Sequence, residues 1–314
     1  MDIGRPFIRL PFTFDAERLA EEIGSIADSA WMQHPQRLTG NSAVALISRD
    51  GTDNDDFSGR MQETKHLRGC AYLRQVLASF DEVLGRSRLM KLAAGSEVAI
   101  HVDFNYHWYS RVRIHIPIVT NSQVTFYCAD QKTNMGAGES WIFNAWRRHR
   151  VSNESDQDRV HLVVDTAGSA RFWSMLRNAV AGSQETQHIP YVAGEAPDIR
   201  TEQHNIAAVM APGEVDALFG DLIADFESNP KNDAVLVSSY RSLLFDFSKD
   251  WREIWLQHGD DKNAWPLYQS VIEKAYERMQ PDQRAIVTQS NDIGVNPIIV
   301  QRILRSALAD QGDG

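Results

Sequence analysis

The chain has 314 residues, of which 43% are hydrophobic and 24% are charged, which is ordinary for a folded, water-soluble protein. Its formal net charge of −10 argues against a nucleic-acid partner, because phosphate binding relies on clustered Lys and Arg. The absence of a long apolar run, of a signal-peptide pattern in the first residues and of CxxC spacing predicts a cytoplasmic protein with no membrane partner and no thiolate metal site.

Strands and helices are mixed in the N-terminal part of the sequence. A strand is predicted at residues 7–12, and the spacing of Leu19, Ile23 and Ile26 predicts a helix after it. A buried strand at 42–48 is followed by an aspartate-rich polar loop at 51–59. The amphipathic pattern of residues 71–84 predicts a second helix.

Residues 89–166 contain short segments rich in β-branched and aromatic residues, separated by turn residues. These predicted strands lie at 88–93, 97–103, 111–119, 124–129, 139–144 and 159–165. Many short strands at regular spacing are typical of a double-sheet jelly roll or barrel. We therefore predict an α+β fold with a double-stranded β-helix core, a jelly-roll or cupin-like architecture, and flanking helices.

The C-terminal part of the sequence is predicted to be mainly helical. Helices are expected at 170–180, 214–226, 233–258, 264–279 and 297–308, with a loop-like stretch at 182–213. We place the domain boundary so that residues 1–183 form the jelly-roll domain and residues 184–314 the helical domain. The apolar helix faces are interpreted as packing on one another and on the barrel. A lid, a docking surface for a peptide and a homodimer contact are alternatives.

A set of four polar residues in the strand-rich region suggests a metal site. Residues i and i+2 of a strand share a face, so His101 and Asp103 can reach one ion. With His149 they form the two-histidine, one-carboxylate set that holds non-haem Fe(II) with open coordination positions. Arg159 offers a planar fork suited to a carboxylate. Taken singly, each residue has an ordinary explanation: a histidine bonded to an acid at a strand end for His101 and Asp103, a solvated basic turn for His149 and a surface arginine for Arg159.

A second polar face is predicted on the strand at 111–119. Val112, Ile114 and their alternating neighbours share one face, and Arg111, Arg113 and His115 share the other. The polar face either meets water or faces the barrel interior. In the interior it would offer cationic and hydrogen-bonding groups to an anion beside the metal.

The order of these segments resembles the aspartyl/asparaginyl β-hydroxylase family of Fe(II)/2-oxoglutarate-dependent oxygenases, which includes bacterial proline hydroxylase-like proteins. The similar segments are LMKLAAGSEVAIHVD (89–103), RVRIHIPI (111–118), GESWIFNAWRRHRVSN (138–153) and RVHLVVD (159–165). Weaker similarity extends upstream, so the resemblance covers residues 7–168.

The resemblance implies roles for individual residues. It implies His101, Asp103 and His149 as catalytic iron ligands, Arg159 as the partner of the distal 2-oxoglutarate carboxylate, and Arg113 and His115 near its metal-chelating end. Fe(II), 2-oxoglutarate and O2 are the implied cofactor and cosubstrates. Some family members have a serine eleven residues before the first metal histidine, where this sequence has Met90, which leaves a second contact to the distal carboxylate unassigned.

Candidate substrate contacts come from the segment after the HxD motif and from two arginines. Tyr106, His107 and Trp108 lie in a polar-aromatic loop of the kind that shapes pockets or forms an ordinary surface turn. Arg111 and Arg148 are candidates for binding a substrate carboxylate. Trp141 and Phe143, on the strand before His149, are interpreted as core residues beneath the metal.

The predicted function is therefore a 2-oxoglutarate-dependent dioxygenase that hydroxylates an amino-acid side chain. The substrate is a free, proline-like amino acid or an Asp, Asn or Pro residue in a peptide. One alternative is a non-catalytic, cupin-like metal-binding or sensor protein. Another is a Zn(II) hydrolase, because zinc accepts the same ligands, although this reading leaves Arg159, Arg113 and His115 unexplained.

Overall fold

The computed structural model describes residues 2–33 and 40–309, and the protein forms two compact units. The barrel unit comprises residues 1–103 and 110–205, and the helical unit comprises residues 104–109 and 206–314. The sequence boundary was predicted at residue 183, whereas the barrel unit continues to Asn205. The reason is pairing: the strand Gln187–Ile189 pairs with the first strand, and Thr201 forms a bridge with Leu84.

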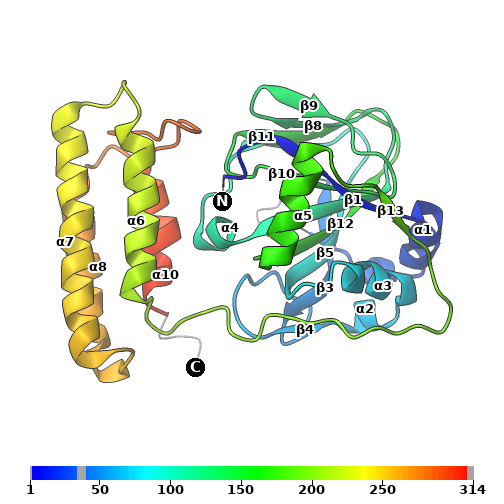
Figure 1. Ribbon diagram of the computed structural model, residues 1–314, viewed down its shortest axis with the longest axis horizontal. Helices are drawn as coiled ribbons and strands as arrows, with labels where there is room; N and C mark the ends of the chain where they lie inside the picture. The colour runs from blue at the N-terminus through cyan, green and yellow to red at the C-terminus, as the bar shows by residue number, and fades with distance from the viewer. Residues whose placement is uncertain (1, 34–39, 310–314) are drawn as a thin grey trace. The chain divides into compact units, whose positions relative to one another are not determined.

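The barrel unit contains two β-sheets that lie one above the other (Figure 1). Its strands are β1 (Phe7–Phe14), β2 (Met32–Gln33), β3 (Asn41–Arg49), β4 (Met61–Glu63), β5 (Leu84–Leu92), β6 (Glu97–His101), β7 (Val112–Val119), β8 (Val124–Cys128), β9 (Gln131–Thr133), β10 (Glu139–Phe143), β11 (His149–Asn153), β12 (Arg159–Thr166) and β13 (Gln187–Ile189). The large sheet has the order β13-β1-β10-β7-β12-β5-β3-β2, with β4 paired to β3, and the small sheet has the order β6-β11-β8-β9.

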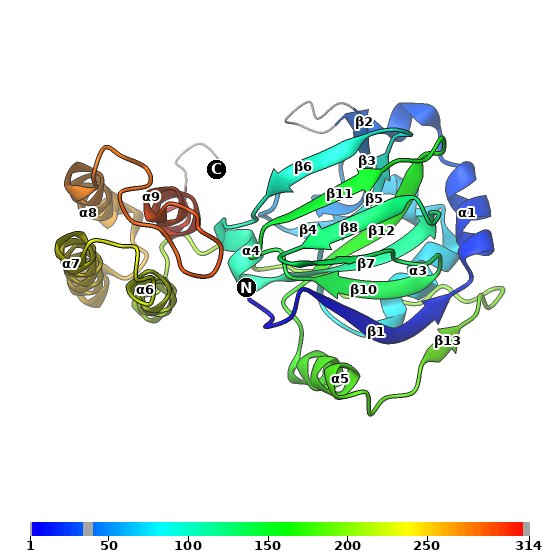
Figure 2. The ribbon, with the colours of Figure 1, turned by 90° about the horizontal axis from the view of Figure 1, so that it is seen from above.

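The polypeptide alternates between the two sheets from β5 to β12. Strands β5, β7, β10 and β12 belong to the large sheet, whereas β6, β8, β9 and β11 belong to the small one. Seen from above, β6, β11 and β8 lie in front of the large sheet (Figure 2). Two antiparallel sheets connected in this way form a jelly roll, which confirms the predicted double-stranded β-helix core.

Helices cover the outer face of the large sheet. The helical segments of the barrel unit are α1 (Ala16–Gly24), the short 3-10 turn η1 (Asp28–Ala30), α2 (Lys65–Arg68), α3 (Ala71–Ser79) and α5 (Ala170–Ala181). Leu19 of α1, Leu73 of α3 and Phe172 of α5 share one buried cluster with Ile114 and Ile116 of β7. Since side chains alternate along a strand, Arg113 and His115 lie on the opposite, inner face.

The predicted helix at 71–84 ends earlier than expected, at Ser79. Asp81 has a positive φ of 50°, which a right-handed helix does not allow, and Leu84 begins β5. The strand β11 was not predicted, because HRVSN has no apolar alternation. Residues Tyr106–Ser110, predicted as a loop, form the short helix α4.

The helical unit contains the helices predicted for the end of the sequence. They are α6 (Pro212–Glu227), α7 (Ala234–His258), the short turn η2 (Lys262–Ala264), α8 (Trp265–Arg278) and the continuous helical stretch of α9 (Val295–Ile298), the π-helical η3 (Ile299–Leu304) and α10 (Arg305–Ala307). Phe247 and Trp251 of α7 contact Phe219 of α6 and Tyr268 of α8. The apolar faces of these helices therefore pack on one another.

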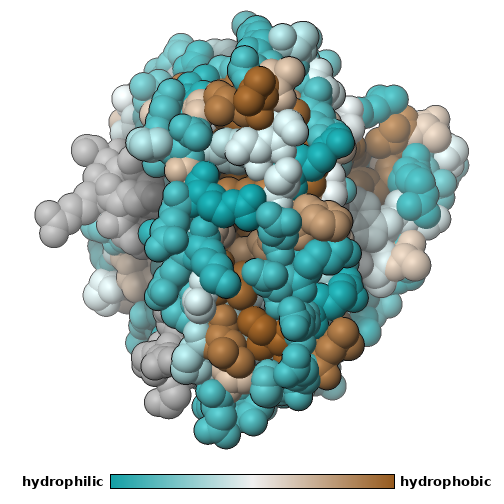
Figure 3. Space-filling view, turned by 90° about the vertical axis from the view of Figure 1, so that its left-hand side faces the viewer, coloured by the Kyte–Doolittle hydropathy of each residue, from teal (hydrophilic) through white to brown (hydrophobic). Residues whose placement is uncertain are grey.

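Some hydrophobic side chains of the helical unit remain exposed. Val235, Phe245 and Leu256 of α7 are among them. The space-filling view shows separate hydrophobic patches, in brown, within a mostly hydrophilic surface (Figure 3). Among the helices of residues 2–33 and 40–309, none combines the length and apolar character needed to cross a membrane.

Candidate active site

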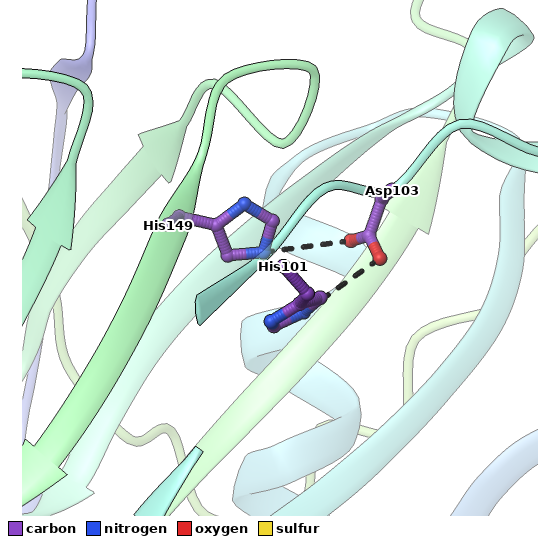
Figure 4. Close-up of side chains that lie close together, drawn as sticks. All are labelled: His101, Asp103 and His149. Atoms are coloured by element: carbon purple, nitrogen blue, oxygen red, sulfur yellow. Dashed lines mark ion pairs between the residues drawn. The ribbon is translucent and has the colours of Figure 1, made fainter. Parts of the chain in front are cut away.

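The structure brings His101, Asp103 and His149 together at one edge of the small sheet. His101 ends β6 and His149 begins β11, and the two residues are direct cross-strand partners. Asp103 lies just past the end of β6, where its backbone N–H donates to the carbonyl of Ala145 at 3.0 Å. The ligand atoms of the three side chains lie within 4.8 Å of one another, and they converge on one point (Figure 4).

The spacing of the three side chains suits a shared ion. The Nε2 atoms of His101 and His149 each lie 3.8 Å from a different carboxylate oxygen of Asp103. This is too long for a hydrogen bond, but two atoms so placed can both bind a divalent ion at about 2.1 Å. The three residues therefore fit the metal set predicted from the sequence, with only one protein carboxylate among them.

Backbone carbonyls orient both imidazole rings. Nδ1 of His101 lies 2.8 Å from the carbonyl oxygen of Ala99, and Nδ1 of His149 lies 2.9 Å from that of Arg147. A carbonyl oxygen only accepts, so each Nδ1 carries the proton and each Nε2 keeps its lone pair toward Asp103. Histidine ligands of metals are typically held by such a second hydrogen bond.

Burial differs among the three side chains. The side chain of His149 is 4% exposed, whereas that of His101 is 43% exposed. Burial lowers the pKa of His149, and the nearby Asp103 carboxylate only partly opposes that effect. His149 is thus held as the neutral imidazole that a metal ion requires.

A line of buried and partly buried rings connects His149 with the interior of the jelly roll. The ring of Phe143 lies 4.8 Å from that of His149 and 4.9 Å from that of His115. His115 lies 5.9 Å from His161, which stacks on Phe126 at 5.3 Å. Both ring nitrogens of His115 and of His161 are buried without a hydrogen-bond partner among the described residues. Burial lowers the pKa of each histidine well below its usual value.

Arg159 lies on this same inner face, at the start of β12. Its guanidinium lies over the ring of Phe126, 5.5 Å from the centroid, and its Nε and Nη1 are buried without a hydrogen-bond partner among the described residues. Burial lowers its pKa to about 10. A buried guanidinium without a carboxylate is costly, so this position suits an anionic ligand.

Arg113 has a different environment from Arg159. Its Nε and Nη2 donate to the two carboxylate oxygens of Asp165 at 2.7 and 2.8 Å. Asp165 is fully buried and faces Arg113 across β12 and β7. The bidentate pair fixes the arginine beside His115. Direct contact of Arg113 with a cosubstrate stays a prediction, since its Nε and Nη2 already donate to Asp165.

The residues predicted to contact substrate are divided between the two units. Tyr106, His107 and Trp108 lie on α4, in the part of the sequence that groups with the helical unit, and Tyr106 donates to Glu214 of α6. Arg148 is exposed and adjoins His149 in the sequence. The role of these residues as substrate contacts stays a prediction.

Arg111 is engaged elsewhere. Its Nε and Nη2 donate to the carboxylate oxygens of Glu202 at 2.7 and 2.9 Å, and both side chains are about nine-tenths buried. Because Glu202 accepts from both Nε and Nη2, this side of the Arg111 guanidinium is not available to bind a substrate carboxylate in the same bidentate way. We therefore interpret Arg111 as a structural residue that ties β7 to the segment around Glu202.

Three residues of the inner face were not predicted as site residues. His161 alternates with Arg159 along RVHLVVD, and this alternation is the signal that identifies it. Arg86 and Arg88 alternate in the same way along β5, and both are buried. Carboxylates from distant parts of the sequence, Asp55 and Asp165, lie against these arginines inside the protein.

Residues 31–168 match the sequence profile described as aspartyl/asparaginyl β-hydroxylase. The matched segment contains the three candidate metal ligands and Arg159. This match confirms the resemblance seen in the sequence. A particular relative is an L-proline cis-4-hydroxylase of Rhizobium meliloti (strain 1021), to which the protein is 25% identical over 271 residues, 83% of its own length and 89% of that relative.

Partial structural matches to solved proteins were also found. A 2OG-Fe(II) oxygenase family oxidoreductase from Burkholderia pseudomallei aligns with a TM-score of 0.36 and 12% identity, over 49% of this protein and 78% of that one. A prolyl-4-hydroxylase from Pseudomonas putida aligns with a TM-score of 0.35 and 12% identity, over 52% of this protein and 92% of that one.

Proposed function

We propose that the protein is an Fe(II)/2-oxoglutarate-dependent dioxygenase that hydroxylates an amino-acid side chain. Two findings support this activity: the match of residues 31–168 to the aspartyl/asparaginyl β-hydroxylase profile, and the similarity to the relative named L-proline cis-4-hydroxylase. The observation that carries the proposal is that one jelly roll contains a His-Asp-His set and the buried Arg159, whose Nε and Nη1 have no hydrogen-bond partner among the described residues. The His-Asp-His set suits a ferrous ion, and Arg159 suits a carboxylate of a dicarboxylic acid.

His101, Asp103 and His149 would hold the iron. With 2-oxoglutarate and dioxygen, iron supplies the oxidising power that converts a C–H bond into C–OH, while the oxoacid becomes succinate and carbon dioxide. Two imidazoles and one carboxylate leave coordination positions open for the cosubstrates. The hydrogen bonds from Nδ1 to backbone carbonyls keep both imidazoles oriented while other ligands enter and leave those open positions.

Arg159 would bind the distal carboxylate of 2-oxoglutarate. Its Nε and Nη1 have no hydrogen-bond partner among the described residues, so its guanidinium is available to donate to that group. His115 lies between Arg159 and the triad, since its ring contacts that of Phe143, which contacts His149. Neutral His115 can donate one hydrogen bond without adding charge, and the apolar rings around it keep water from the cosubstrate.

The two alternative functions make different use of these residues. A zinc hydrolase would use the triad but has no role for Arg159 or for the neutral His115 and His161. A non-catalytic sensor would bind metal and an anion without turning either over. Both alternatives predict that no succinate forms.

The test is 2-oxoglutarate turnover by the purified 314-residue protein supplied with Fe(II), ascorbate and air. We expect succinate in amounts that match the oxygen gained by amino acids in a panel of free and peptide-bound forms, measured by mass spectrometry. His149→Ala should form none. Failure of the wild-type protein to bind 2-oxoglutarate in the presence of metal would overturn the proposal.

A further inference from the structure

The turn between β10 and β11 contacts two of the three candidate metal ligands. It comprises residues 144–147 and leads into His149. The carbonyl of Ala145 accepts the backbone N–H of Asp103 at 3.0 Å. The carbonyl of Arg147 accepts the proton on Nδ1 of His149, at 2.9 Å between the two heavy atoms. The position of this turn therefore sets the positions of both ligands.

The third ligand is oriented by a different part of the small sheet. Nδ1 of His101 lies 2.8 Å from the carbonyl oxygen of Ala99, within β6. A shift of the turn would thus move Asp103 and His149 relative to His101. A divalent ion needs all of its ligand atoms at about 2.1 Å. The turn must therefore keep a fixed position for the site to keep its affinity.

Asn144 stabilises the turn from within. It is buried, and its Oδ1 accepts the backbone N–H of Trp146 at 3.3 Å. Its carbonyl accepts the backbone N–H of Arg147 at 3.0 Å, and its own backbone N–H donates to the carbonyl of Pro6 at 3.0 Å. The last of these hydrogen bonds connects the turn to the short N-terminal segment that precedes β1.

Asp2, in that N-terminal segment, binds both ends of the turn. Its Oδ1 accepts a hydrogen bond from Nδ2 of Asn144 at 2.6 Å, and its Oδ2 accepts one from Nη2 of Arg147 at 2.7 Å. Its Oδ1 also accepts the backbone N–H of Gly4 at 2.9 Å, which orients the carboxylate on its own segment. A single carboxylate thus connects the first and last residues of the turn.

The charge of Asp2 strengthens these contacts. Partial burial opposes its ionisation, but the hydrogen bonds from Gly4 and Asn144, together with the charge and hydrogen bond of Arg147, outweigh that effect and lower its pKa. The carboxylate is therefore ionised at neutral pH. Hydrogen bonds to an ionised acceptor are roughly twice as strong as those between neutral groups.

The same contacts should add little to the stability of the fold. The side chains of Asp2 and Arg147 are 33% and 34% exposed. Ion pairs that solvent reaches contribute little to the free energy of unfolding. The effect of Asp2 should therefore appear in the geometry of the metal site and much less in the melting temperature.

We propose that Asp2 is a positioning residue of the metal site, which holds the turn 144–147 so that the ligands attached to it reach the same ion as His101. Asp2 acts through the turn and does not touch the metal. The residue lies outside the segment 31–168 that matches the family profile. This inference rests on the metal site of the proposed function, and it is independent of the substrate.

The first experiment measures Mn(II) affinity by calorimetric titration of the whole protein. Asp2→Ala removes the acceptor of all the hydrogen bonds described above, and we expect the affinity to fall roughly tenfold, the lower end of what loss of an outer-shell partner costs. Asp2→Asn keeps an oxygen for Gly4 and Asn144 but loses the charge, so its affinity should lie between those of wild type and Asp2→Ala. Asp28→Ala, at an exposed position, is the matched control and should bind as wild type does. The melting temperatures of the metal-free proteins should be nearly the same.

The second experiment examines the geometry of the site with Co(II), whose visible absorption depends on the number and arrangement of its ligands. We expect the spectrum of Co(II)-saturated Asp2→Ala to differ from that of wild type, and the spectrum of Asp28→Ala to coincide with it. A residue that served only the stability of the fold would leave the spectrum of the folded, saturated protein unchanged.

A double-mutant cycle tests whether Asp2 acts through the turn. Arg147→Met removes the donor to Asp2 and keeps the backbone carbonyl that accepts from His149. The effects of Asp2→Ala and Arg147→Met on the free energy of Mn(II) binding should be non-additive, because both variants lose the same contact. Strictly additive effects would overturn the inference, since Asp2 would then act independently of Arg147.

The outcomes separate this inference from the proposed function. Unchanged Mn(II) affinity and an unchanged Co(II) spectrum in Asp2→Ala would overturn the inference and leave the proposed function standing. A strongly lowered melting temperature without loss of affinity would also overturn it, because Asp2 would then serve the fold alone. Absence of metal binding by wild type would instead overturn the proposed function, and this inference with it.

Discussion

His101 and His149 are direct cross-strand neighbours on β6 and β11, and their ring centroids lie 4.1 Å apart. Positions 48 residues apart in the sequence are thus placed side by side by two strands of the small sheet. Antiparallel pairing puts the two side chains on one face. Asp103, just beyond the end of β6, completes the set with no long loop involved.

Replacing His149 by Ala should therefore abolish metal binding. Of the three ligands His149 is the most buried, so water cannot readily take its place with the same geometry. We expect the affinity for Mn(II) or Fe(II) to fall roughly a hundredfold or more, beyond what loss of an outer-shell partner costs. Calorimetric titration with Mn(II) measures this, and His258→Ala, an exposed position at the end of α7, is the matched control. Retained metal affinity in His149→Ala would remove the residue from the ligand set.

The metal set could be predicted because its chemistry is local in the sequence. The i, i+2 spacing of His101 and Asp103 on a strand is visible without coordinates. The strand that carries His149 was not predicted, since Arg150, Ser152 and Asn153 give it a polar composition. It forms because β8 and β6 pair with it on both sides, and such pairing is a property of the whole sheet.

The buried charges could not be predicted for a related reason. Arg86 and Arg88 resemble a solvated face unless Asp55 is known to accept from both of them. The same is true of Arg111, whose partner Glu202 lies 91 residues later. Long-range ion pairs leave no periodic signal in the sequence, whereas the apolar alternation of β7 and the helical spacing of α6 and α7 do.

Replacing Arg159 by Met should weaken 2-oxoglutarate binding without removing the metal. The guanidinium is buried and lacks a carboxylate partner in the described part of the protein, so its loss leaves no protein group unpaired. We expect the Kd for 2-oxoglutarate, measured on the Mn(II)-loaded protein, to rise roughly a hundredfold or more. The melting temperature without cosubstrate should stay the same or rise. An unchanged Kd would contradict the assignment.

His161 should supply a second contact to the same carboxylate. Its Cα pairs with that of Met90, the position where some family members have a serine, and both of its ring nitrogens are buried without a partner among residues 2–33 and 40–309. His161→Phe keeps a ring that can stack on Phe126 but removes the donor. We expect a rise in the 2-oxoglutarate Kd of about tenfold.

A double-mutant cycle tests whether His161 and Arg159 act on one group. The effects of His161→Phe and Arg159→Met on the free energy of 2-oxoglutarate binding should be non-additive, since both contacts meet the same ligand carboxylate. Strictly additive effects would place the two residues at separate sites.

The buried pair of Arg111 and Glu202 should matter for stability. Arg111→Met leaves the Glu202 carboxylate buried without its bidentate partner, which typically costs about 3–5 kcal/mol. Urea denaturation of the metal-free protein measures this loss. The double variant Arg111→Met with Glu202→Met removes both charges and should recover much of the free energy of unfolding. If the single variant keeps full stability but loses substrate binding, the structural interpretation of Arg111 is wrong.

The buried histidines should make the protein less stable in mild acid. His115 and His161 have pKa values well below the usual value, chiefly because burial disfavours their charged forms. In the unfolded state both titrate near a pKa of about 6.5, so below that pH the unfolded state binds more protons and stability falls. Each histidine should contribute a loss of about 1.4 kcal/mol per pH unit, beginning below about pH 6.5 and continuing toward its folded pKa. Urea denaturation of the metal-free protein between pH 7.5 and 5 measures how steeply the free energy of unfolding falls with pH. His161→Phe should make this slope shallower by the contribution of one histidine. Identical slopes for wild type and His161→Phe would mean that His161 already binds a proton in the folded protein at these pH values.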